Sequence, residues 1–215
     1  MRSPFDRGWH TAVVVASGPS FDQAQADTIE AARAAGAVRC IVVNECFRLI
    51  PKADALYAAD AAWYSLRIAD VRATFRGELW TQHEGQLRVD GGKREQWIDV
   101  AGRWGIKIIR SEPGAGMHPA DNCVYRGGNS GHQAIGLATL FGATRIVLCG
   151  FDLQGGHWHG QHPLPLSNGN PASWREKFEP LARDLAAAGI DCVNASAATA
   201  LTCFPRAKLA EALGV

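Results

Sequence analysis

The feature that most constrains this chain is a repeated alternation between short, β-branched apolar runs and longer stretches with helical periodicity. Residues 11–16 (TAVVVA) form the first run, and a predicted helix over residues 21–35 follows it. This alternation is typical of a mostly parallel sheet that is covered by helices on both faces. The sequence therefore predicts a Rossmann-like α/β fold.

Polar residues stand at the ends of the first strands. The runs at residues 40–43 and 55–58 lead into Asn44 and Asp60. Ligands of open parallel sheets bind beyond the carboxyl ends of the strands, so we expect a site there. Further strands are expected at residues 79–81, 107–109, 145–149 and 191–193, and further helices at residues 61–71, 131–141, 174–188 and 207–213.

Two segments break this alternation. Residues 82–104 are rich in charge and glycine, and residues 151–171 read FDLQGGHWHGQHPLPLSNGNP. Long loops without regular structure are uncommon in compact domains unless they serve as lids or binding loops. We expect the loop near 151–171 to border the site.

The composition favours a soluble protein with a single domain over residues 1–215. Hydrophobic residues make up 47% and charged residues 20%, and no apolar run approaches the roughly 18 residues of a membrane span. The apolar run near the N-terminus is too short for a signal sequence, and the six cysteines fit reduced core positions, so we expect a cytoplasmic protein. A net charge of +1 argues against an extended nucleic-acid surface. The sequence is compatible with a homo-oligomer but does not decide the oligomeric state.

Two glycine-containing turns are candidates for nucleotide binding. The first, residues 17–20, joins the first strand to its helix; its glycine permits close approach of a ligand, and the free N–H groups at a helix start can hold a phosphate. The second precedes an apolar helix, where three glycines surround an Asn-Ser pair. Each turn can also be only a turn or a helix cap. The candidate residues are Ser17, Gly18, Pro19, Ser20, Gly128, Asn129, Ser130 and Gly131.

The histidine-rich loop is the third candidate. His157, His159 and His162 follow the strand-end Asp152. A histidine beside a carboxylate can titrate near neutral pH, as a general base for a hydroxyl requires. A metal site and a merely solvated loop are the alternatives; because no carboxylate or thiol stands at ligand spacing within the loop, we expect no metal.

Three further positions are open to two interpretations. Asn44 and Asp60 are candidates for reading a base or a ribose, although each could instead cap the following helix. Trp174 heads an apolar stripe at helical spacing, which we interpret as helix core rather than a base-stacking surface.

In this order the motifs resemble those of the bacterial lipooligosaccharide sialyltransferases and of a related domain in motility-accessory proteins and archaeal hydroxymethylpterin pyrophosphokinases. The resemblance is carried by VVVASGPS at 13–20, VNECF at 43–47, the GGNSG turn, the strand ending at Asp152 and the HWHGQH loop. It implies a GT-A variant of the Rossmann-like fold. It also implies that Asn44 contacts the nucleotide and that His157 is the general base.

The resemblance implies transfer of a sialic acid-like sugar from a donor such as a CMP-sugar to an acceptor hydroxyl, without a required cofactor. The family's first-turn Asn is replaced by Ser17, and its pair of tyrosines that assists the leaving phosphate has no counterpart here. Two alternatives remain. One is pyrophosphoryl transfer with ATP and Mg²⁺, with Asp60 and Asp152 as metal ligands. The other is a non-catalytic nucleotide-binding protein that serves assembly.

Overall fold

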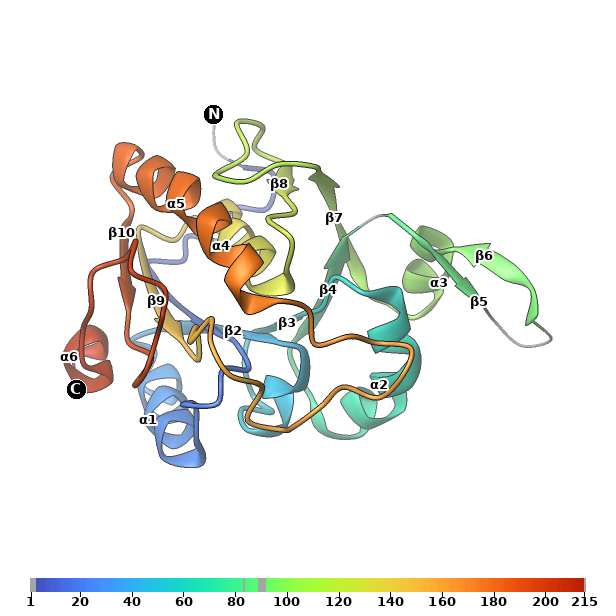
Figure 1. Cartoon of the computed structure of the whole chain (residues 1–215), viewed down its shortest axis with the longest axis horizontal. Coiled ribbons are helices and arrows are strands. Elements are labelled where there is room, and N and C mark those ends of the chain that lie inside the picture. Colours follow the sequence, from blue (N-terminus) through green and yellow to red (C-terminus); the bar gives the residue numbers. More distant parts are fainter. Residues whose placement is uncertain (1–2, 83, 89–91, 215) are drawn as a thin grey trace.

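The computed structural model describes residues 3–82, 84–88 and 92–214. Among these residues, eight strands form one parallel sheet in the order β10-β9-β1-β2-β3-β4-β7-β8 (Figure 1). The predicted Rossmann-like α/β fold is confirmed. The strands are β1 (Thr11–Val15), β2 (Arg39–Val43), β3 (Ala55–Tyr57), β4 (Glu78–Gln82), β7 (Lys107–Glu112), β8 (Cys123–Tyr125), β9 (Arg145–Cys149) and β10 (Asp191–Asn194).

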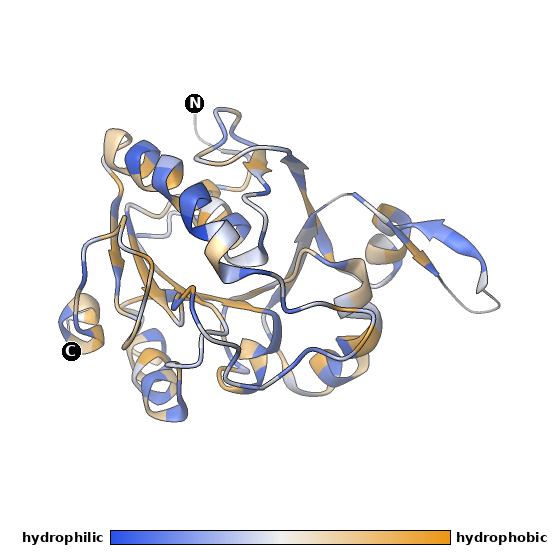
Figure 2. Ribbon diagram, viewed as in Figure 1, coloured by the Kyte–Doolittle hydropathy of each residue, from blue (hydrophilic) through white to orange (hydrophobic). Residues whose placement is uncertain are grey.

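Helices cover both faces of the sheet because successive strand residues point to opposite sides. Val13 and Val15 of β1 pack in one core with α1, α2 and α6, whereas Val14 packs in the other with α4 and α5. Figure 2 shows the apolar strands enclosed between the two layers. The helices are α1 (Gln23–Ala34), α2 (Ala61–Thr74), α3 (Trp97–Arg103), α4 (Ser130–Leu140), α5 (Pro171–Ala187) and α6 (Leu209–Leu213), with a 3-10 turn, η1, at Asn44–Arg48.

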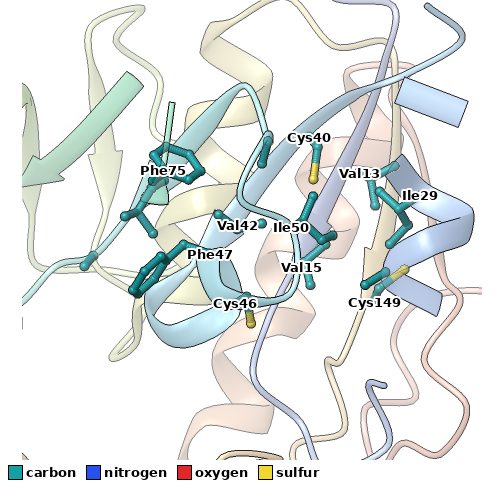
Figure 3. Close-up of a cluster of buried hydrophobic side chains, with 14 of the residues drawn as sticks. Val13, Val15, Ile29, Cys40, Val42, Cys46, Phe47, Ile50, Phe75 and Cys149 are labelled. Atoms are coloured by element: carbon teal, nitrogen blue, oxygen red, sulfur yellow. The ribbon is translucent and has the colours of Figure 1, made fainter. Parts of the chain in front are cut away.

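The first core also contains three of the buried cysteines (Figure 3). Cys40, Cys46 and Cys149 are fully buried beside Val42 and Ile29, and none of the six cysteines forms a disulfide. Burial raises the pKa of Cys46 and of Cys149 to about 12, so these thiols stay protonated. They serve as small apolar side chains, as the sequence predicts.

The strand order places a topological switch point beside β1. The chain proceeds outward from β1 through β2, β3 and β4 on one side, while β9 and β10 are added on the other. The loops after β1 and β9 therefore diverge and leave a crevice at the carboxyl edge. The segment between β9 and α5 extends past η1 and α2 before it returns to α5 (Figure 1).

The expectation for residues 82–104 was wrong in part. This region contains a hairpin of β5 (Gln86–Arg88) and β6 (Arg94–Gln96), followed by α3, rather than a continuous loop. The hairpin extends from the main body beside α3 (Figure 1). Trp97 is fully buried against Tyr64 of α2 and anchors this extension. By contrast, residues 151–170 contain no helix or strand, as expected.

No helix in the described part of the chain combines the length and the apolar character needed to span a bilayer.

Candidate functional site

A pocket of about 290 Å³ opens at the carboxyl edge of the sheet, at the switch point. The loops after β1, β2, β3 and β9 line it, together with the N-terminus of α4 and the start of α5. Ten of the residues predicted from the sequence lie in its wall. They are Ser17, Gly18, Asn44, Asp60, Gly128, Asn129, Ser130, Gly131, His157 and His162.

Four predicted residues lie outside this wall: Pro19, Ser20, Asp152 and His159. The Asp152 carboxylate accepts the backbone N–H of Ser20 at 2.8 Å and the Ser20 hydroxyl at 2.8 Å. The turn after β1 is thereby held to the end of β9, and Gly18 is required there because a Cβ would lie 2.4 Å from Asp152 Oδ1. Asp152 and Ser20 therefore shape the turn, and the Ser20 amide is not free for a phosphate.

The N-terminus of α4 is better placed for a phosphate. Asn129 is the N-cap, and its side chain accepts the backbone N–H of His132 at 2.9 Å. Within the described residues, the N–H groups of Ser130 and Gly131 have no acceptor. Both residues line the pocket, so two unpaired amides at the positive end of a helix lie in its wall.

The hydroxyl of Ser130 has a structural task of its own. It accepts the backbone N–H of Ala59 at 3.1 Å and so joins α4 to the loop after β3. This contact fixes the distance between the amides of α4 and Asp60, one residue farther along. This hydrogen bond therefore connects the two parts of the pocket wall that come from α4 and from the loop after β3.

The three loop histidines form one cluster. The His157 ring stacks on His159 with centroids 5.1 Å apart and lies 5.0 Å from His162. The backbone N–H of Trp158 donates to the carbonyl of Ser17 at 3.1 Å, which docks the loop on the first turn. His157 and His162 line the pocket, whereas His159 does not.

Burial keeps these imidazoles neutral. Partial desolvation and the neighbouring His162 lower the pKa of His157, and the pKa of His159 falls to about 4 for the same reasons. Burial also lowers the pKa of His162, against the opposing effect of Glu45. At neutral pH the rings are therefore available as proton acceptors.

Asn44 and Leu153 have positive φ values of 50°, and both line the pocket. No other non-glycine residue in the described part of the chain has such a value. The left-handed region is unfavourable for a branched or apolar side chain, and such strain gathers at functional sites. The Asn44 side chain forms no hydrogen bond with the described residues and does not cap η1.

Asp60 is the only carboxylate among the described residues that line the pocket, and no lysine or arginine is among them. It precedes α2, but its side chain makes no capping hydrogen bond. The side chain is exposed to solvent at the pocket. Partial desolvation raises its pKa, and nearby His162 opposes this shift.

Trp174 is one of the pocket residues that the sequence interpretation missed. The three lower members of its stripe, Phe178, Leu181 and Leu185, are fully buried, as predicted. Trp174 itself is half-buried in the first turn of α5 and lines the pocket beside Gly128. α5 begins at Pro171, three residues before the predicted start at residue 174. Asn170, which caps α5, and Pro171 in the first helical position are the sequence signals for this start.

A separate group, Glu112, His118 and Cys123, has ligand atoms within 4.8 Å of one another. However, His118 Nδ1 accepts the N–H of Ala120 at 3.0 Å, so its Nε2 carries the proton and faces Glu112 at 3.3 Å. Both nitrogens are therefore engaged, and a metal would have to break the Ala120 bond. We do not assign a metal to this group.

These features, rather than a known relative, define the site: no family model matches the chain, and the search of curated proteins found no match.

Proposed function

We propose that the protein is a metal-independent glycosyltransferase of the GT-A variant type, which moves a sugar from a nucleotide donor to an acceptor hydroxyl. The observation that carries this proposal is the meeting of two groups in one pocket. Unpaired amides at the start of α4 suit a phosphate, and the neutral His157 suits the removal of a hydroxyl proton.

In this reaction the acceptor hydroxyl gives its proton to His157, and its oxygen attacks the anomeric carbon of the donor. The bond between that carbon and the phosphate oxygen breaks, and the nucleotide leaves with the electron pair. The N–H groups of Ser130 and Gly131 would stabilise the negative charge on the leaving phosphate. These amides would take the part that the tyrosine pair plays in the family that the sequence resembles.

Aromatic and amide groups in the wall suit the rest of the donor. Half-buried Trp174 offers a ring face for a base, and the Asn44 amide, which has no partner among the described residues, can donate and accept hydrogen bonds. Pyrophosphoryl transfer with Mg²⁺ has less support, because both oxygens of Asp152 already accept hydrogen bonds from Ser20. That leaves Asp60 alone of the two predicted metal ligands in the pocket.

The first test is a thermal-shift panel of CMP, UDP, GDP, ADP and ATP, each with and without Mg²⁺, together with their nucleotide sugars. A ligand that binds only the folded protein raises the melting temperature as its concentration exceeds its dissociation constant. A metal-independent shift with a nucleotide and its sugar supports the proposal. A shift with ATP and Mg²⁺ alone would favour pyrophosphoryl transfer, and no shift at all would favour an assembly role.

The second test replaces the proposed base. His157→Ala should lower the transfer rate roughly 100-fold or more, because general base catalysis contributes on that order, while nucleotide binding is retained. His10→Ala is the matched control, since His10 is exposed and contacts Thr144 away from the pocket. Equal rates for His157→Ala and the wild type would refute the base assignment.

A further inference from the structure

The charge balance of the pocket bears on which sugar it can hold. Among the described lining residues Asp60 is the only charged group, and the two histidines that reach the pocket are neutral at neutral pH. Positive potential comes from the start of α4, where the amides of Ser130 and Gly131 are unpaired. One phosphate group would use both of these amides.

Asp60 lies close to the proposed reaction centre. Asp60 lines the same pocket of about 290 Å³ as His157 and His162. The His162 ring in turn lies 5.0 Å from His157. Because His157 must reach the acceptor hydroxyl at the anomeric carbon, a sugar bound for transfer would share this pocket with Asp60.

The Asp60 carboxylate is also free to act on such a sugar. Its side chain makes no hydrogen bond or ion pair with the described residues, although its backbone carbonyl accepts N–H groups of α2. A carboxylate accepts hydrogen bonds only, so it suits sugar hydroxyls as donors. It repels a second carboxylate, and the described wall supplies no cationic side chain to offset that repulsion.

We propose that the donor sugar is a neutral, polyhydroxylated ring rather than a carboxylated one, and that Asp60 is the residue that selects it. This inference rests on the proposed transfer function and departs from the sialic acid-like donor that the resemblance implies. In sialic acid the carboxylate is attached to the anomeric carbon itself. The acid group and the leaving phosphate would then compete for the single cluster of amides at α4.

A pair of donors that differ in one carboxylate tests this proposal directly. UDP-glucose and UDP-glucuronic acid share their nucleotide, and CMP with CMP-N-acetylneuraminic acid forms a second comparison. We expect UDP-glucuronic acid to bind roughly tenfold or more weakly than UDP-glucose, and CMP-N-acetylneuraminic acid to bind no more tightly than CMP. Titration calorimetry or thermal shift gives the ratios.

Asp60→Asn keeps the size of the side chain and removes its charge. In this variant we expect the dissociation constants of the two UDP-sugars to lie within about threefold of each other, because UDP-glucose binds more weakly and UDP-glucuronic acid more tightly. Affinities are compared as ratios to free UDP, which reports the general effect of the removed charge on an anionic nucleotide. Circular dichroism checks folding, which Asp60 does not support by any side-chain hydrogen bond with the described residues.

The outcomes separate the two proposals. If no nucleotide binds the wild type, the transfer function itself fails and the donor inference fails with it. If nucleotides bind but UDP-glucuronic acid or CMP-N-acetylneuraminic acid gains affinity from its acidic sugar, the transfer function stands and the neutral-donor inference is overturned. The wild-type comparison decides this even if Asp60→Asn does not fold.

Discussion

At the scale of single residues, Asn44 and Asp60 are pocket residues whose side chains have no hydrogen bond within the described part of the fold. Asn44 adopts a φ of 50°, and neither it nor Asp60 uses its side chain to cap the element that follows. A residue that is strained but has no structural partner is retained most simply for a ligand. The capping interpretation is therefore wrong for both positions, whereas contact with a ligand stays a prediction.

A pair of substitutions tests whether the Asn44 side chain contacts a ligand. Asn44→Gly and Asn44→Ala both remove the amide, but only glycine relieves the left-handed backbone. We expect Ala to be less stable than Gly by about 1 kcal/mol in urea unfolding, while both variants lose nucleotide affinity equally. If both variants bind nucleotide as the wild type does, Asn44 contacts no ligand.

His157 gives a prediction for pH. A general base must be neutral, and burial lowers its pKa below the ordinary value of 6.5. The transfer rate at saturating substrate should therefore rise with pH through an apparent pKa below 6.5 and level off by neutral pH. A rate that falls over this range would mean that a protonated group is required instead.

At the scale of elements, the turn between β1 and α1 depends on Asp152. This side chain is 1% exposed and accepts both the amide and the hydroxyl of Ser20. Asp152→Ala would leave two donors without their partner, whereas Asp152→Asn keeps one acceptor oxygen. We expect Ala to lower the free energy of unfolding by about 1–3 kcal/mol and Asn to cost less.

Urea unfolding of the two Asp152 variants, monitored by circular dichroism, gives these values. Ser20→Ala is the matched control, because it removes the hydroxyl donor and leaves the hydrogen bond from the Ser20 backbone N–H to Asp152 intact. Its loss should be smaller than that of Asp152→Ala. Equal stability of Asp152→Ala and the wild type would show that the turn does not depend on this clamp.

The elements also show what the sequence could predict. The central strands were predictable because each is an unbroken apolar run, buried on both faces, as at residues 40–43. β8 has only three residues and exists through its pairing with β7, a contact that no local pattern reveals. β5 and β6 have only three residues each, and α3 has seven, so the helical spacing of its buried Trp97, Val100 and Ala101 extends over a single turn and is too short to set a period.

The candidate site, like the fold, could be predicted only where a local sequence pattern marks it. Glycine turns and polar strand ends have local signatures, and the parallel sheet gathers them at one edge. The exclusion of Asp152 and the inclusion of Trp174 depend on distances between segments far apart in the chain. Local periodicity contains no such distances, so composition and spacing could not decide them.

At the scale of the whole molecule, the pocket lies between the two cores that the sheet separates. The turn after β1 leads into α1 on one face, while α4 and α5 cover the other and supply the amides and Trp174. α4 and α5 share this second core, and both contribute residues to the pocket wall. His132 lies where α4 meets α5, with its ring 5.5 Å from the ring of Phe178.

The last prediction concerns the pH dependence of stability through His132, which is 1% exposed. Its Nε2 accepts the N–H of Gly116 at 3.3 Å, and protonation would place two donors face to face. Burial accordingly lowers its pKa to about 4 from 6.5. The unfolded chain thus binds the proton first as the pH falls, and the folded state loses up to about 3 kcal/mol between pH 6.5 and pH 4.

Urea unfolding at about pH 7 and about pH 5 measures this loss. In His132→Gln the position no longer titrates, so the variant should lose less stability than the wild type over this interval, even if it is less stable at pH 7. His10→Gln, at an exposed position, should retain the full dependence. An unchanged dependence in His132→Gln would assign the acid sensitivity to the loop histidines, whose pKa values are also lowered. The packing of α4 on α5 would then not be the part of the molecule that responds to acid.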